Sequence, residues 1–164
     1  MRILAGLLLM LAALALLAIA AGQFGLLGGK APQDLGVREG KLNAPSVTPN
    51  SVSSQAELWP GHLGQAYARI APLALAGDGA ATMRKLAAIV GAMPGAVVVT
   101  ATDDYLYARF TTRWMRFTDD TEFWLDRAAG VVQVRSASRV GVGDLGANRR
   151  RIRAFFEELE PALR

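Results

Sequence analysis

The chain has 164 residues, of which 52% are hydrophobic, with 18 basic residues, 14 acidic residues and no cysteine. This length allows one domain plus an N-terminal segment, and the lack of cysteine excludes disulfides and thiolate metal sites. A formal net charge of +4 is too small to indicate a nucleic-acid partner.

The first predicted element is an uncharged apolar segment, ILAGLLLMLAALALLAIAAG, from Ile3 to Gly22. It is long enough to cross a bilayer as a helix, which needs about 20 residues, and longer than the core of a cleaved signal, roughly 7 to 15 residues. We therefore predict a retained anchor over residues 1–29, while Ala18-Ile19-Ala20 leaves cleavage open as the alternative. Arg2 directs the N-terminus toward the cytoplasm and the remainder outside.

Residues 30–61, called the lead-in below, are rich in proline, serine, asparagine and glycine. Such a composition predicts an irregular linker that becomes an ordered approach to a domain spanning residues 62–164. The stretch His62–Leu75 is ambiguous. Pro72 argues against an uninterrupted helix there, and a short edge strand around Tyr67–Ala71 is one alternative.

The domain is predicted to alternate from helix to sheet to helix. Asp78 can cap a helix that ends at Pro94-Gly95 and buries the stripe Met83, Leu86, Ala87, Val90 and Met93. Four strands are predicted at residues 96–102, 105–112, 115–126 and 131–138, and a second helix at residues 144–164. The expected fold is α+β: an N-terminal transmembrane helix, then a two-layer domain with a roughly four-stranded antiparallel meander and both helices on one face.

The last helix has a buried stripe at three-four spacing, formed by Ile152, Phe155, Phe156, Leu159 and Leu163. Extended backward, the stripe meets Arg149, Asn148 and Leu145. Arg150, Arg151 and Arg153 point away from it. We therefore expect Arg149 to turn inward beside Asn148.

The third and fourth strands set the predicted register. Their apolar faces, which include Met115, Phe117 and Val140, match if Phe123 lies opposite Val134. That register puts Thr121 opposite Ser136 and Asp119 opposite Ser138 on the helix face. On the other face it pairs Glu122 with Arg135 and places Asp120 diagonal to Arg139, charge pairs expected on a solvated sheet surface or, alternatively, beneath a partner.

The candidate ligand-binding residues are Asp119, Thr121, Ser136, Ser138, Asp144, Asn148 and Arg149. One interpretation is structural: Arg149 and Asp119 form a buried ion pair that fixes the helix on the sheet. The other is an anion or lipid-headgroup site, with Arg149 and the free amides of residues 144–147 as donors. No catalytic residue, cofactor or metal is predicted, because Ser138 lacks a nearby base, the single His62 lies outside the strands, and adjacent aspartates point to opposite faces.

Several stretches resemble the uncharacterised family called domain of unknown function 1499: TPNSVSS, DDTEFWLD, the pair Asp104-Tyr105, and VRSASRVGVGDLGANRRRI. The resemblance covers residues from Gly36 onward. It implies an exported or membrane-attached bacterial protein, with chloroplast relatives and no established activity. Similar members carry a cysteine pair at positions that correspond here to Ala44 and Ser51, so a role for that pair cannot apply. The family's signature residues correspond to Asp119, Asp120, Glu122, Arg135, Ser136, Ser138, Arg139, Asp144, Asn148, Arg149 and Arg151.

Together these observations predict a single-pass, non-enzymatic protein of the bacterial inner membrane, with its N-terminus cytoplasmic and its domain in the periplasm or outside. Its expected partner is an envelope protein or an anionic lipid. The alternative is an enzyme or small-ligand binder that acts on an anionic envelope molecule through Asp119, Ser138, Asn148 and Arg149.

Overall fold

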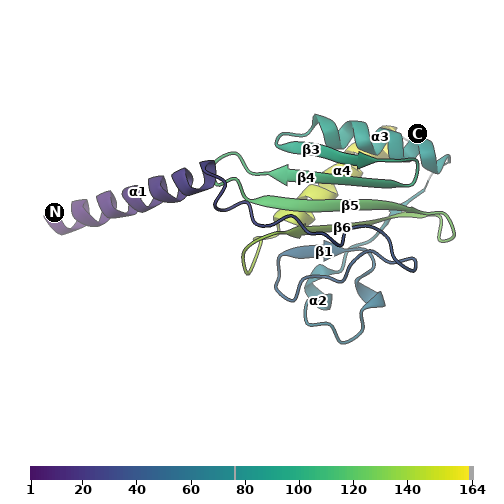
Figure 1. Ribbon diagram of the computed structural model, residues 1–164, viewed down its shortest axis with the longest axis horizontal. Helices are drawn as coiled ribbons and strands as arrows, with labels where there is room; N and C mark the ends of the chain where they lie inside the picture. The colour runs from purple at the N-terminus through teal and green to yellow at the C-terminus, as the bar shows by residue number, and fades with distance from the viewer. Residues whose placement is uncertain (76, 163–164) are drawn as a thin grey trace.

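The computed structural model describes residues 1–75 and 77–162, with side chains to Leu159 (Figure 1). An apolar helix, α1 (Arg2–Gln23), projects from one end of an α+β domain. The domain elements in chain order are β1 (Ser51–Ser53), the 3-10 helix η1 (Ala56–Leu58), α2 (Gln65–Ala68), β2 (Leu73–Ala74), α3 (Gly79–Ala92), β3 (Ala96–Ala101), β4 (Tyr105–Thr111), β5 (Thr118–Asp126), β6 (Val131–Ser138) and α4 (Ala147–Ala162).

The sheet is antiparallel and has six strands in the order β1-β6-β5-β4-β3, with β2 also paired to β6. The predicted fold class is confirmed, but the predicted number of four strands is too small. The two extra strands, β1 and β2, are too short to show a hydrophobic period in the sequence. In the stretch Tyr67–Ala71, where an edge strand was considered, the helical turn α2 ends at Ala68, Arg69 forms an isolated bridge with Ser53, and the strand β2 follows at Leu73.

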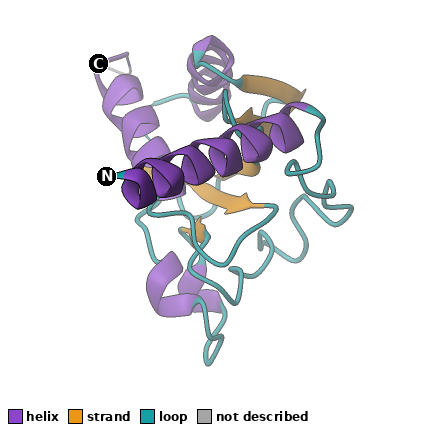
Figure 2. Cartoon of the chain, turned by 90° about the vertical axis from the view of Figure 1, so that its left-hand side faces the viewer, coloured by secondary structure: helices purple, strands orange, loops and turns teal. Residues whose placement is uncertain are grey.

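Both long helices of the domain cover one face of the sheet, here called the helix face (Figures 1 and 2). The carboxylate of Asp78 caps α3 by accepting the amide of Ala80 at 2.9 Å, as its position before the helix predicts. In α4, the ring of Phe155 lies between Phe110 and Phe123, with centroids 5.5 and 5.7 Å away. The core therefore lies between the helix face of the sheet and the two helices.

The register of β5 and β6 is the one predicted: Phe123 pairs with Val134, Thr121 with Ser136, and Asp119 with Ser138. The predicted start of β5 was too early, whereas the predicted bounds of β6, residues 131–138, are the observed ones. β5 begins at Thr118, so Met115 and Phe117 lie in the preceding turn, and Phe117 is 37% exposed. β6 ends at Ser138, before Val140.

The start of α4 also differs from the prediction. The helix begins at Ala147, and Leu145, which was placed on the buried stripe, has a φ of 51° and is exposed. Its side chain lies before the first turn and cannot follow the helical period. The predicted stripe residue Leu163 lies outside the described residues.

The part of the lead-in that precedes β1 packs on the face of the sheet opposite the helices, here called the outer face (Figure 1). The amide of Gly36 donates to Glu122 at 2.7 Å, and the carbonyl of Ala44 accepts Nε of Arg135 at 3.1 Å. Leu42 is buried as well. The expectation that the outer charge pairs are solvated is therefore wrong: Asp120 and Glu122 are 2% and 0% exposed.

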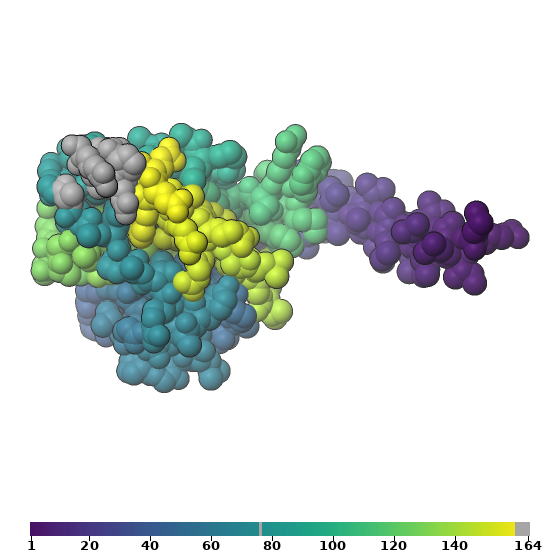
Figure 3. All heavy atoms as spheres, turned by 180° about the vertical axis from the view of Figure 1, so that it is seen from behind, coloured from purple at the N-terminus to yellow at the C-terminus, as the bar shows by residue number. Residues whose placement is uncertain are grey.

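The C-terminal end of α1 contacts the loop between β4 and β5, as the space-filling view shows (Figure 3). Nε2 of Gln23 donates to the carbonyls of Arg113 and Trp114 at 3.1 and 2.9 Å, and Gly22 is buried against Met115. The most apolar 18 residues of α1 have a mean hydropathy of 2.9. This value suits a membrane anchor or a signal sequence.

Candidate functional site

The predicted polar band on the helix face is a continuous hydrogen-bonded cluster. The Ser136 hydroxyl donates to Oδ1 of Asn148 at 2.5 Å, and the Thr121 and Ser136 hydroxyls lie 2.7 Å apart. Nδ2 of Asn148 donates to Oγ of Ser138 at 3.1 Å. Thr121, Ser136 and Asn148 are all 0% exposed, so these bonds satisfy polar groups that have left water.

The arginine that joins this cluster is Arg151. Its Nη2 lies 2.6 Å from Oδ2 of Asp119, and its Nη1 donates to Oδ1 of Asn148 at 2.9 Å. The guanidinium also stacks 4.6 Å from the ring centroid of Phe110, an additional favourable contact for a cation. The prediction that Arg151 points into water is wrong.

The predicted pairing of Arg149 with Asp119 is also wrong. Arg149 turns toward α2, where it donates to the carbonyl of Arg69 at 2.8 Å and to the carbonyl of Tyr67. Its guanidinium lies 5.7 Å from the centroid of the Tyr67 ring. Arg149 therefore ties α4 to the α2 segment, whereas Arg151 ties α4 to the sheet.

Asp144 occupies the amides at the start of α4. Its Oδ1 accepts the amide of Gly146 at 2.9 Å and the hydroxyl of Tyr67 at 2.6 Å, and its Oδ2 accepts the amide of Asn148 at 3.0 Å. Burial alone would raise the pKa of Asp144, but these hydrogen bonds outweigh it and hold the pKa below its ordinary value. Of the amides of residues 144–147 that were expected to bind an external anion, that of Gly146 thus already binds the protein's own carboxylate, and those of Asp144 and Ala147 donate to backbone carbonyls.

A hollow of about 460 Å³ lies beside this cluster at the end of the domain nearest α1. Asp119, Ser138 and Asp144 form part of its wall. The remaining wall is largely apolar and includes Leu26, Leu27, Phe117, Val140 and Leu145. Its lining combines the edge of the polar cluster with the apolar loops next to α1.

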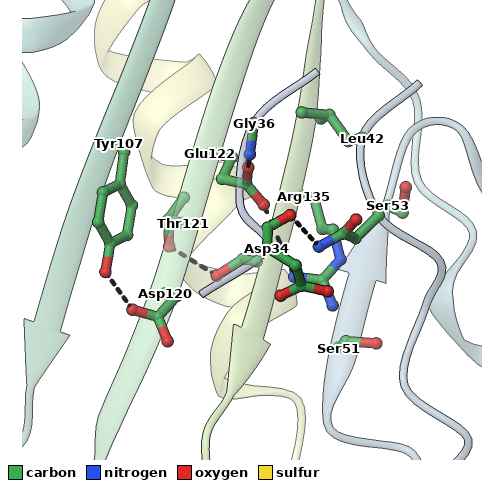
Figure 4. A network of polar contacts seen from close by, with 12 residues as sticks. Asp34, Gly36, Leu42, Ser51, Ser53, Tyr107, Asp120, Thr121, Glu122 and Arg135 are labelled. Atoms are coloured by element: carbon green, nitrogen blue, oxygen red, sulfur yellow. Dashed lines mark hydrogen bonds and ion pairs between the residues drawn. The ribbon is translucent and has the colours of Figure 1, made fainter. Parts of the chain in front are cut away.

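The outer face carries a second charged network, shown in Figure 4. Arg139 donates two hydrogen bonds of 2.8 Å to the carboxylate of Asp120, one from Nε and one from Nη2. The Tyr107 hydroxyl donates to the same carboxylate at 2.6 Å. Burial, together with this bond to Asp120, raises the pKa of Tyr107 to about 12, so the phenol stays protonated and remains a donor.

Glu122 is less completely satisfied than Asp120. Its Oε1 accepts from Gly36 and from the Tyr105 hydroxyl, both at 2.7 Å, while Oε2 has no hydrogen-bond partner among the described residues. Nη1 of Arg135 is the nearest positive group, at 3.7 Å from Oε2. Burial therefore raises the pKa of Glu122 above its ordinary value, despite the amide, hydroxyl and guanidinium that oppose the shift.

Beside this network the outer face holds a cavity of about 440 Å³ between the sheet and the lead-in. Its wall includes Lys30, Asp34, Trp59, Asp120, Arg135 and Arg139. Figure 4 shows Asp34 of the lead-in facing Arg135 of β6.

Four aromatic residues of these sites were not predicted from the sequence: Tyr67, Tyr105, Tyr107 and Trp59. The period-two pattern of β4 could have indicated Tyr105 and Tyr107, because they share a face and lie opposite Trp124 and Glu122. Tyr67 and Trp59 lie in irregular segments and carry no such signal. Among the described residues, no group of three or more histidine, aspartate or glutamate side chains could hold a metal ion.

Comparison with known proteins yields one family. The model of the family described as protein of unknown function (DUF1499) matches residues 41–159, which contain the six-stranded sheet, α3 and most of α4. No curated protein and no solved structure matches the chain. Because the family model covers well over half of the sequence, the chain belongs to the DUF1499 family.

Proposed function

We propose that this protein is a single-pass membrane protein of the bacterial cell envelope whose exported domain rests on the outer surface of the inner membrane and binds anionic phospholipid. In this proposal α1 is a retained anchor, and the domain binds rather than catalyses. The observation that carries the proposal is the docking of the β4–β5 loop on the last turns of α1.

The depth of that loop along α1 supports membrane contact. Trp114 and Met115 form a hollow together with Ala15, Ala18 and Ile19 of α1. At a rise of 1.5 Å per residue, Ala18 lies about 8 Å along the helix from Gln23. If α1 spans the bilayer, Trp114 therefore lies at the interface between headgroups and hydrocarbon, where tryptophan is enriched.

Three neighbouring loops at this end expose apolar side chains. They follow α1, join β4 to β5, and join β6 to α4. The exposed residues are Phe24, Leu26, Trp114, Phe117, Val142 and Leu145. Leu145 is 94% exposed. Apolar side chains gathered beside a membrane helix favour a bilayer as the covering surface.

The charge of this end favours anionic lipid over neutral lipid. Arg113 and Arg116 flank Trp114 in the β4–β5 loop, both are exposed, and residues 112–117 include no acidic residue. Each basic residue near an anionic membrane surface contributes about 1 kcal/mol of attraction. The apolar hollow bounded by Asp119, Ser138 and Asp144 lies at the same end, where it suits the hydrocarbon of a bound lipid.

The test uses the full chain in bilayers that contain brominated lipids, which quench tryptophan fluorescence only at the depth of the bromine atoms. We expect quenching in wild type that disappears in Trp114→Phe, because Trp59 and Trp124 lie in the lead-in and in the sheet. In Arg113→Gln/Arg116→Gln we expect weaker quenching, mainly in bilayers rich in phosphatidylglycerol.

Two results would overturn this proposal. Equal quenching of wild type and Trp114→Phe would mean that the loop does not reach the bilayer. Equal quenching in phosphatidylcholine and phosphatidylglycerol, unchanged by the double arginine variant, would exclude anionic lipid and favour a protein partner for this end.

A further inference from the structure

The cavity on the outer face lies between the sheet and the lead-in, and Ser138 lines both this cavity and the hollow near α1. Its volume of about 440 Å³ lies within the range of small-molecule sites, roughly 300 to 1,000 Å³. It lies between two layers, the outer face of the sheet and the lead-in packed on it. The charged side chains that line the cavity come from both layers, so they face the same space from two sides.

Arg135 is the central donor in this cavity. Its side chain is only 12% exposed, and Nε is used by the carbonyl of Ala44. The 3.7 Å separation from Glu122 is too long for a hydrogen bond, so Nη1 and Nη2 donate to no described residue. The two terminal nitrogens of this mostly buried guanidinium are therefore free to donate. Together they form the fork that binds carboxylate and phosphate oxygens.

Two further donors line the same cavity. The indole Nε1 of Trp59 is buried and has no hydrogen-bond partner among the described residues. Arg139 uses Nε and Nη2 on Asp120, and its Nη1 makes no hydrogen bond within the described chain. Buried donors are nearly always paired, so the unpaired indole of Trp59 favours a ligand that accepts its hydrogen bond, and the free nitrogens of Arg135 and Arg139, which are not fully buried, can donate to the same ligand.

The charges of the wall favour an anion. Lys30, Arg135 and Arg139 oppose Asp34 and Asp120, and Arg139 already neutralises Asp120 through two hydrogen bonds. Asp34 is exposed, so water screens it more than the buried arginines. Among the unpaired groups of the wall, the carboxylate of Asp34 is exposed to water whereas the guanidinium of Arg135 is mostly buried, which favours an anion over a cation.

We propose that this cavity binds a small oxyanion, a carboxylate or a phosphate ester, with the guanidinium fork of Arg135 as its main contact and Trp59 and Lys30 as additional donors. The site is independent of the proposed lipid surface, which lies on other loops. A ligand held here joins the lead-in to the sheet.

The test is isothermal titration of the full chain in nonionic detergent with citrate, inorganic phosphate and glycerol 3-phosphate. We expect saturable binding of a carboxylate or of a phosphate. Loss of one charge-assisted hydrogen bond costs about 1.5 to 3 kcal/mol, so Arg135→Lys, which keeps the charge beside Glu122 but not the fork, should bind about 10- to 100-fold more weakly.

Two other variants separate binding from folding. Trp59→Phe removes only the indole donor, and Ala44→Leu fills part of the cavity without changing a charge. Both should weaken binding while the melting temperature stays near that of wild type. Arg84→Gln is the matched control, because Arg84 lies on α3 across the sheet and its loss should leave binding unchanged.

The same titration in nanodiscs identifies the source of the oxyanion. If the probe still binds in phosphatidylglycerol nanodiscs, the natural ligand is a soluble oxyanion. If the probe binds in detergent but not in phosphatidylglycerol nanodiscs, the lipid headgroup occupies the cavity and is the natural ligand. The proposal is overturned if none of the three probes binds saturably in detergent, or if Arg135→Lys and Ala44→Leu both bind like wild type.

Discussion

Two arginines near the start of α4 make contacts that contribute differently to the stability of the fold. Arg151 neutralises Asp119, a carboxylate that is 5% exposed, whereas Arg149 donates to backbone carbonyls that can rebind water. Removing one partner of a buried ion pair leaves an uncompensated charge, which typically costs about 3 to 5 kcal/mol. Losing hydrogen bonds from a charged group to exposed carbonyls costs about 1.5 to 3 kcal/mol at most.

We therefore expect Arg151→Ala to lower the free energy of unfolding by about 3 to 5 kcal/mol and Arg149→Ala by clearly less. Chemical denaturation of both variants measures the difference, with the exposed Arg150 replaced by alanine as the control. Equal losses for Arg149 and Arg151, or a larger loss for Arg149, would contradict the observed pairing with Asp119.

Glu122 gives a prediction about pH. Burial raises its pKa in the folded protein above the ordinary value of 4.5, so the folded state holds this proton more tightly than the unfolded chain. The resulting stability is present below pH 4.5 and is lost as pH rises through the raised pKa.

Glu122→Gln cannot ionise and should escape this loss. We expect the melting temperature of the variant, measured relative to wild type at each pH, to increase from about pH 4 to pH 7. A relative melting temperature that falls over this range would mean that the carboxylate is stabilised in the folded protein.

The sequence pointed to the right carboxylate and hydroxyls but to the wrong arginine. Positions 149 and 151 flank the same stripe, since Arg149 precedes Ile152 by three residues and Arg151 precedes Phe155 by four. Which flank faces Asp119 depends on the direction in which α4 crosses the sheet, and no local pattern encodes that direction. A long side chain that leans toward the helix N-terminus, as in Arg151, then completes the contact.

At the scale of elements, the lead-in behaves as a layer of the domain. Leu42 is 1% exposed, and its amide donates to Oε1 of Gln55 at 2.8 Å. We expect Leu42→Ala to reduce the free energy of unfolding by about 2 to 5 kcal/mol, as for other buried leucines. Val47→Ala, at a position in the same segment that is 65% exposed, should change it little.

Denaturant titration of these two variants tests the role of the lead-in. Similar stabilities of Leu42→Ala and wild type would show that the lead-in can leave the sheet without weakening the fold, contrary to its burial here.

The elements that sequence analysis predicted share a simple period. The alternation of Phe123, Thr121 and Asp119 against Val134, Ser136 and Ser138 gave the register, because a slip by one residue would have put the apolar side chains on the wrong face. The lead-in has no period, and its contacts are mostly single amides and carbonyls. Its position on the outer face, and hence the burial of the charge pairs and the existence of the cavity, could not be predicted from local patterns.

At the scale of the whole molecule, the contact between α1 and the domain depends on a glycine. Any side chain at Gly22 would collide with the backbone of Met115, whereas Gly6 has open space around it. We expect Gly22→Leu to displace the β4–β5 loop from α1, and Gly6→Leu to leave it in place, although both variants increase the hydrophobicity of the helix.

Trypsin digestion of the full chain in proteoliposomes measures this displacement, since Arg113 and Arg116 lie in the loop. Cleavage there should be slow in wild type and in Gly6→Leu and faster in Gly22→Leu. Equal cleavage rates in the two leucine variants would indicate that the loop does not depend on α1 for its position.

The pairing of β1 with β6 joins one of the first segments of the domain to one of the last, because Ser51–Ser53 hydrogen-bonds beside Arg135–Ala137. During synthesis, β1 has no neighbouring strand until more than eighty further residues have left the ribosome, although Ser53 also bridges to the nearby Arg69. Glu122 and Asp120 of β5 likewise lack their ionic partners until Arg135 of β6 and Arg139, just after it, have been synthesised. Contacts between such distant segments form slowly, so this domain can close only as a late event, once nearly the whole polypeptide has been delivered to the compartment where it folds.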